Sequence, residues 1–213
     1  NTSATSITLK QDGSSVNPKL GQDQSELFKF SVKNNAENNE DVSVSEITLK
    51  EDSSIDETTE LANVALYYNG KEVAKVASMT NKYVTFKLVS PILIKEGKTE
   101  KFSVKADIIG GAGDTVSFIV DNDLDITATS SKYGYVSIDS SLVDTKGETG
   151  ELTVQAGELT LVDLDAPSDI IREDKDDVVL GTVKVTNIAG KNLELQEFGV
   201  KATLTPGTAT SGG

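Results

Sequence analysis

The sequence has no cysteine and no histidine, and these two absences narrow the chemistry open to it. Without cysteine the chain forms no disulfide bond and no thiolate metal site. Without histidine it lacks the commonest general base and the commonest transition-metal ligand of proteins. The sequence also shows no glycine-rich loop leading from a strand into a helix, so it lacks a phosphate-binding cradle. We therefore expect a protein that is not an enzyme.

Basic residues are few compared with acidic ones. The chain has 20 lysines and arginines against 34 aspartates and glutamates, which gives a net charge of −14. Affinity for nucleic acid comes largely from basic side chains on phosphates, so this balance argues against nucleic acid and against an anionic membrane surface. No apolar run approaches the roughly 18 residues of a membrane span. Acidity, absent cysteine and abundant threonine and serine favour a location outside the cell.

Aromatic residues make up only 5% of a chain that is 37% hydrophobic, so valine, isoleucine and leucine must form most of the core. Apolar residues alternate with polar ones at a period of two, which is typical of strands, and no sustained helical stripe occurs. The clearest inward sets are Phe28, Phe30 and Val32; Val84, Phe86 and Leu88; Phe102, Val104, Ala106 and Ile108; and Val116, Phe118 and Val120. The sequence therefore predicts an all-β fold, with turns spaced as in a β-sandwich.

Two local features specify this prediction further. Asn69-Gly70 separates two alternating segments, and this dipeptide favours a two-residue hairpin turn because both residues tolerate positive φ. In residues 42–50 the apolar parity changes: Val42 and Val44 share one phase, whereas the apolar residues after them share the other. A flat strand cannot bury both pairs on one side, so we predict a β-bulge near Ser45-Glu46.

The chain also contains an internal repeat. Residues 157–187 have the same layout as residues 6–34, namely a short strand, an acidic turn-rich stretch and a longer alternating strand. LFKFSVKN (27–34) aligns with LGTVKVTN (180–187), and VSVSEITLK (42–50) aligns with LELQEFGVK (193–201), which has the same change of phase. We predict one complete module over residues 1–155 and the first strands of a second, incomplete module over residues 156–213.

Three strands alone would leave an open edge and an uncovered apolar face. We expect the second module to be completed by a polypeptide that continues beyond Gly213 or by another chain, for which the N-terminal NTSATSITLK is a candidate donor strand. The sequence begins at Asn1 and its single methionine is Met79, so we expect a processed mature protein or a fragment of a longer one.

The segments LANVALYYNGKEVAKV, KFSVKADIIGGAGDTVSF and DLDITAT, followed by the restart at GELTL, resemble the tandem immunoglobulin-like repeats of large bacterial cell-surface and S-layer-type proteins. The resemblance covers most of the first module and the opening of the second. It implies an immunoglobulin-like antiparallel β-sandwich on the cell exterior that serves as structure or adhesion. It implies no catalytic residues.

Candidate site residues are acidic or aromatic. Asp121, Asp123 and Asp125 lie at alternate positions of DNDLD and are candidate Ca²⁺ ligands, with a solvated inter-strand loop as the alternative. A second acidic run, DLDAPSDIIREDKDD (163–177), is either a cation site at the module junction or a solvated loop. Tyr133 and Tyr135 form either a sugar-binding platform or the cover of a sheet edge.

The expected function is that of an extracellular structural protein of the cell surface, which assembles through immunoglobulin-like modules into an S-layer, a filament or a stalk. Its expected partners are other copies of itself or neighbouring surface proteins. The alternatives are an adhesin or carbohydrate-binding module that uses the loops of residues 121–135, and an accessory region of an extracellular hydrolase.

Overall fold

The computed structural model describes residues 5–37, 39–139, 151–157, 159–163, 181–187 and 197–201, together with residues 176, 177, 179 and 195. In these residues the secondary structure is almost entirely β, with one turn of 3-10 helix and no α-helix. The elements in chain order are β1 (Ser6–Gln11), β2 (Ser25–Asn34), β3 (Val42–Glu51), β4 (Leu61–Tyr68), β5 (Lys71–Val76), β6 (Tyr83–Ile94), β7 (Thr99–Ile108), β8 (Thr115–Val116), β9 (Phe118–Ile119), η1 (Asp123–Asp125), β10 (Ile126–Ser130), β11 (Ser137–Asp139), β12 (Leu152–Thr153), β13 (Leu159–Asp163) and β14 (Val183–Asn187). The all-β prediction is confirmed.

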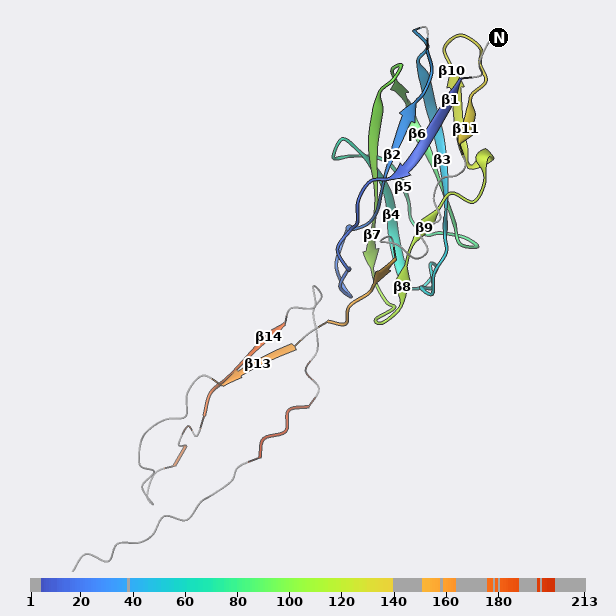
Figure 1. Cartoon of the computed structure of the whole chain (residues 1–213). Coiled ribbons are helices and arrows are strands. Elements are labelled where there is room, and N and C mark those ends of the chain that lie inside the picture. Colours follow the sequence, from blue (N-terminus) through green and yellow to red (C-terminus); the bar gives the residue numbers. More distant parts are fainter. Residues whose placement is uncertain are drawn as a thin grey trace, which may run out of the picture.

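Most strands belong to two sheets. The larger has the order β11-β1-β2-β7-β4-β5, and the smaller has the order β10-β3-β6 with β9 also paired to β3. Figure 1 shows them forming one elongated body. Neighbouring strands are antiparallel except β1 and β11, which run parallel. The prediction of a purely antiparallel arrangement is thus wrong for this pair. The two strands are far apart in the chain, so no hairpin dictates their relative direction.

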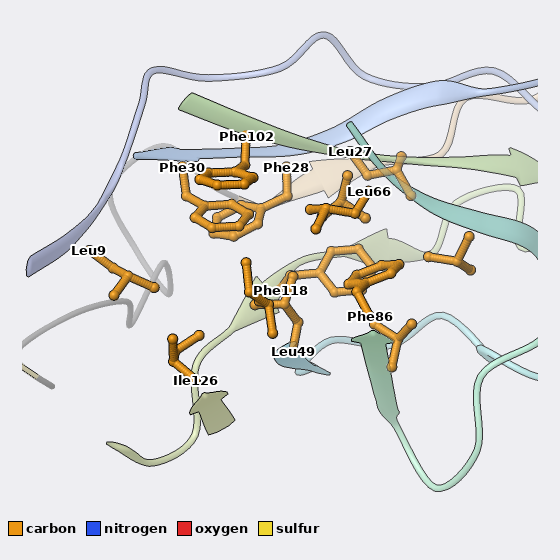
Figure 2. Packing of buried hydrophobic residues seen from close by; sticks show 14 of the residues in the cluster. Leu9, Leu27, Phe28, Phe30, Leu49, Leu66, Phe86, Phe102, Phe118 and Ile126 are labelled. Carbon is orange, nitrogen blue, oxygen red and sulfur yellow. The ribbon is translucent and has the colours of Figure 1, made fainter. Parts of the chain in front are cut away.

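The core lies between the two sheets. Five of the six phenylalanines are buried there, and they come from both sheets: Phe28 and Phe30 from β2, Phe102 from β7, Phe86 from β6 and Phe118 from β9. The Phe28 ring stacks on Phe30 with centroids 5.4 Å apart and reaches Phe118 of the smaller sheet at 6.3 Å. Figure 2 shows these rings filling the space between the sheets. Burying one phenylalanine contributes about 1.5–3 kcal/mol, so even a low aromatic content anchors this core.

The alternation read from the sequence gives the inward faces correctly. Every residue of the four predicted inward sets is buried, apart from Val120, which packs against the core while partly exposed. The reason is that both sheets keep one face in solvent, so the period-two pattern of each strand maps directly onto burial.

The predicted hairpin is confirmed. Tyr68 of β4 pairs with Lys71 of β5, which leaves Asn69 and Gly70 as a two-residue turn. Their φ angles are 50° and 75°, the left-handed values that such a turn requires.

The predicted bulge in β3 is also confirmed. The register of β3 against β6 shifts between Val44 and Glu46. This shift turns the strand so that Val42, Val44, Ile47 and Leu49 all point into the core with 0% of their surface exposed. The change of apolar parity in the sequence therefore reports a real change of strand phase.

The strand expected over residues 115–120 is divided into β8 and β9. β8 pairs with β12, whereas β9 pairs with β3. Ser117 lies between them and is held by side-chain bonds, since its N–H donates to Ser53 Oγ at 3.0 Å and its hydroxyl donates to the Asp52 carbonyl at 3.1 Å. The alternation survives this change of partners, and for that reason the sequence pattern does not reveal it.

Residues 151–155 are hydrogen-bonded to the end of the body that carries β8. The Gln155 N–H donates to the Pro18 carbonyl at 2.8 Å, and the Leu20 N–H donates to the Gln155 carbonyl at 2.9 Å. Figure 1 shows β1 starting near the N-terminus at one end of the long axis and β8 with its neighbours at the other. The chain therefore enters and leaves this body at opposite ends.

β13 and β14 form a two-stranded sheet of their own. Leu159 pairs with Asn187 in the way that Ile7 pairs with Asn34, and the next four pairs follow in the same relative register as those of β1 and β2. The third strand predicted for this region, residues 193–201, is not confirmed, because its described residues, 195 and 197–201, belong to no strand. Leu180 lies outside the described residues. The division of the chain at residues 155 and 156 stays a prediction.

Candidate functional site

Residues 121–136 connect β9 to β11 and contain the acidic and aromatic residues singled out in the sequence. The segment opens with η1, whose N-cap is Asn122. The Asn122 side-chain oxygen accepts the Leu124 N–H at 2.7 Å, and Asp125 Oδ2 accepts the Asn122 N–H at 3.0 Å. This reciprocal pair is a capping box, which explains why DNDLD folds into a single tight turn.

Asp121 joins this turn to the smaller sheet. Its carboxylate accepts the Tyr83 hydroxyl at 2.8 Å and the Lys50 ammonium at 3.1 Å. The hydrogen bond from Tyr83 and then that from Lys50 lower the pKa of Asp121, and the bond to Asp121 raises the pKa of both Tyr83 and Lys50. The Lys50 ammonium also lies 5.8 Å from the centroid of the Tyr83 ring. The three side chains form one polar cluster at the surface.

The three predicted Ca²⁺ ligands are therefore not equivalent. Asp121 is bound to Tyr83 and Lys50, Asp125 accepts backbone N–H groups of its own turn, and Asp123 is exposed. Within the described residues, no group of three or more acidic side chains is gathered as a metal site would require. Calcium binding at this turn stays a prediction. The second acidic run, 163–177, lies mostly outside the described residues.

Tyr133 and Tyr135 are 60% and 68% exposed, so the rings project from the segment. Gly134 between them has a φ of 72°, which places a left-handed turn at the tip. Ser130 holds the base of this turn, because its hydroxyl oxygen accepts the N–H groups of Lys132 at 3.1 Å and Tyr133 at 3.0 Å. Two exposed rings on a fixed turn can stack against a flat apolar ligand.

Sequence reasoning missed three carboxylates that tie distant segments together. The first is Glu40, which is buried before β3. It accepts hydrogen bonds from the hydroxyls of Thr5 and Ser130, so it links the start of β1 to the end of β10. The bond from Ser130 and then that from Thr5 lower the pKa of Glu40.

The second is Glu51, whose side chain is fully buried at the end of β3. It accepts the Ser53 hydroxyl and the Lys82 ammonium, the latter at 3.2 Å. The Lys82 N–H donates to the buried Glu57 at 2.7 Å, and its φ of 68° is unusual for a lysine. The tight Asn81-Lys82 turn is thus held in its strained conformation by two carboxylates.

The third is Asp107 at the end of β7. Its carboxylate accepts the Gln24 N–H at 2.8 Å, the Gln24 amide at 2.9 Å and the Asn63 amide at 2.6 Å. Burial alone would raise the pKa of Asp107, but these hydrogen bonds outweigh it and lower the pKa. Gln24 and Asn63 both have positive φ, at 46° and 51°, so this carboxylate fixes two irregular points of the larger sheet.

A weak signal for such ties existed in the sequence. Asn34 is shared by the two repeats as Asn187, and in the first copy it is fully buried. Its amide donates to the carbonyls of Glu40 and Ile94 at 2.9 and 3.0 Å. Asn187 itself is exposed, so the shared asparagine corresponds to a buried hydrogen-bonding role only in the first copy.

The hydrogen bonds of these carboxylates and of Asn34 hold loops and strand ends in place. These carboxylates accept hydrogen bonds from hydroxyl, amide and ammonium groups, and such bonds stabilise a charge that is removed from water.

No protein-family model matches the sequence, and no curated protein matches it either. None of the helices in the described part of the chain is long and apolar enough to cross a membrane.

Proposed function

We propose that the chain is an extracellular structural protein of the cell surface, built from immunoglobulin-like modules joined end to end. It assembles with other copies of itself or with neighbouring surface proteins into an S-layer, a filament or a stalk. The observation that carries this proposal is the repeated strand pairing of β1–β2 and β13–β14, which share one register over five consecutive pairs.

The path of the chain supports an extended arrangement. The first body is entered and left at opposite ends of its long axis (Figure 1). Only residues 156–158 separate Gln155, which is hydrogen-bonded to that body, from Leu159 at the start of β13. A connection this short restricts the angles between successive units, so repeated units extend as a rod.

The immunoglobulin-like assignment is supported by two packed sheets around one core. Consecutive strands cross repeatedly between these sheets, as β2 to β3 and β6 to β7 do. Such crossings are typical of sandwich topologies, in which hairpin connections and inter-sheet connections alternate.

Immunogold labelling of thin sections of cells with antibodies against the chain tests the location, and electron microscopy of intact cell surfaces tests the assembly. We expect label on the cell exterior, arranged on a lattice, filament or stalk. Label found only in the cytoplasm would overturn the proposal.

A second candidate, a carbohydrate-binding module or adhesin, is favoured by the exposed Tyr133 and Tyr135. A glycan array probed with the chain and with Tyr133→Ala tests it. Binding lost in the variant supports this candidate. Binding unchanged in the variant rules out this turn as its site.

A further inference from the structure

The outward face of the larger sheet carries an array of lysines, although the chain has a net charge of −14. β1, β2 and β7 lie side by side, and their residues alternate between the core and this face. The outward lysines on these strands are Lys10, Lys29, Lys33, Lys101 and Lys105. Together with the hydroxyl and amide side chains between them, these five lysines form the lysine face.

Strand register separates the lysines from one another. Lys10 and Lys101 both pair with Ser31, and Lys33 lies between two threonines. No two of the five are directly opposed in the pairing of these strands, which avoids the cost of like charges across a sheet. Lysines therefore alternate with hydroxyl residues in two successive rows across three strands: Thr8–Lys33–Thr99 and Lys10–Ser31–Lys101.

The positive charge of this face is only partly neutralised. Lys29 and Lys101 are each paired with a carboxylate, at 2.9 and 2.8 Å. Lys10 and Lys33 form no ion pair with any carboxylate in the part of the chain that the structure describes. In so acidic a protein, two adjacent ammonium groups are thus left for another anion.

The face is hollowed at two places. One hollow is lined by both of these lysines and by hydroxyl and amide side chains: Thr8, Lys10, Ser31, Lys33, Asn35 and Thr99. The other includes Lys29, Ser103 and Tyr67 beside the Asn69-Gly70 turn, together with the ion pair of Lys101 and Asp12. The Tyr67 ring is fixed there, since its hydroxyl donates to Gln24 Oε1 at 3.2 Å and the Lys105 ammonium lies 4.6 Å from its centroid.

We propose that the lysine face binds an acidic polysaccharide, whose carboxylate or sulfate groups meet the ammonium groups while its hydroxyls meet the serine, threonine and asparagine side chains. Lysine is a compact point charge that suits an isolated carboxylate or sulfate. Two hollows in succession across the sheet suit a chain of repeating units, and a fixed tyrosine ring adds a stacking surface for a sugar.

Two other partners fit this face less well. Nucleic acid is favoured by arginine, whose forked geometry matches phosphate and guanine, yet the one arginine of the sequence, Arg172, is not on these strands. A second copy of the chain carries the same lysines on this face, so a contact between two such faces would place like charges opposite each other.

Titration of the full chain at low salt with alginate oligosaccharides, which carry uronate carboxylates, tests the proposal. Calorimetry gives the affinity, and amide chemical shifts give the location. We expect shifts concentrated on β1, β2 and β7, and we expect binding to weaken as salt is added. Lys10→Gln with Lys33→Gln removes the two charges of the first hollow, neither of which is ion-paired within the described residues, and should weaken binding about five- to tenfold. The matched control, Lys87→Gln with Lys95→Gln, removes the same charge from the other sheet and the loop after it.

Each outcome decides the matter. Loss in the Lys10/Lys33 variant, with affinity kept in the control and no binding of neutral dextran, supports an acidic polysaccharide. No binding of alginate or dextran sulfate, or equal loss in both variants, overturns the proposal. Single-stranded DNA bound as tightly as alginate would replace it with general polyanion binding. Oligomers that dissociate only in the Lys10/Lys33 variant, seen by sedimentation, would replace it with self-association.

Discussion

The β1–β2 and β13–β14 strand pairs share a register but differ in burial. Leu9 and Val32 face each other across the first pair and are both 0% exposed, whereas Leu161 and Val185 occupy the same positions in the second and are 53% and 42% exposed. The first pair is covered by the smaller sheet, which supplies partners such as Phe118. The comparison shows that strand register is a local property, whereas burial depends on a second sheet packing over the strand pair.

The largest expected effect comes from truncating the matched leucines. Leu9→Ala should lower the free energy of unfolding by about 2–5 kcal/mol, because it removes buried methyl groups and leaves a cavity. Leu161→Ala should lower it by less than about 0.5 kcal/mol, as is usual for exposed positions. Urea denaturation of both variants measures the difference. Equal losses would show that Leu161 is buried in solution and would remove the contrast between the two strand pairs.

The next largest effect concerns the hydrogen bonds of Asp107, which only the structure reveals. Asp107→Asn should cost about 1–3 kcal/mol, because the new amide N–H₂ would face donors on Gln24 or Asn63 and leave partly buried groups unpaired. Asp123→Asn, at an exposed turn position, is the matched control and should leave stability unchanged. Chemical denaturation at neutral pH measures both. Identical midpoints for the two variants would contradict the role given to Asp107.

The same carboxylate gives a pH dependence with a definite sign. The pKa of Asp107 is lower in the folded chain than in the unfolded one, since its hydrogen bonds outweigh burial. Its contribution is therefore complete above the unfolded pKa of about 3.9 and is lost as the pH falls through the folded value. We expect the parent to lose stability below about pH 4 and Asp107→Asn to lose less over that range. Melting curves from pH 6 downward measure the two slopes, and parallel slopes would contradict this account.

A smaller effect is expected at the hairpin turn. Gly70→Val should cost about 1–2 kcal/mol, because φ at this position is 75° and a Cβ disfavours the left-handed region. Open space surrounds the site, so no steric clash contributes. Gly181→Val, just before β14, also enters open space but without a positive φ, and should be neutral. Thermal melts of the pair check this, and a Gly70 variant as stable as the parent would contradict the turn assignment.

These pairs of positions show what the sequence could predict. Phe30, Phe86 and Val104 were assigned to the core correctly because alternation is set by each strand alone. The Asn69-Gly70 turn and the bulge after Val44 were equally local. The parallel pairing of β1 with β11 was not predictable, because it depends on where a distant segment returns.

The hydrogen-bonded carboxylates were missed for the same physical reason. Glu40 and Glu51, which are buried, and Asp107, which is partly buried, are bound by residues far away in the sequence, and nothing in their immediate neighbours distinguishes them from exposed carboxylates. Asp121 was chosen for its acidic neighbours, yet its partners Tyr83 and Lys50 come from other strands. Composition identifies where charge is concentrated, whereas the fold decides which of those charges are neutralised.

Calcium should have the smallest effect. A Ca²⁺ ion at residues 121–125 would have to displace Tyr83 and Lys50 from Asp121, or backbone N–H groups from Asp125. Half-saturation would stabilise the native state by only about 0.4 kcal/mol, which corresponds to about 1–2 °C in the melting temperature. We therefore expect millimolar calcium, compared with chelator, to shift the melting temperature by no more than this. Asp123→Asn with Asp125→Asn should remove whatever shift is present, and Lys87→Gln should leave it unchanged. A rise of more than about 4 °C, abolished by the double variant, would show that the turn rearranges around the ion and that the hydrogen bonds of Asp121 and Asp125 belong to the calcium-free state.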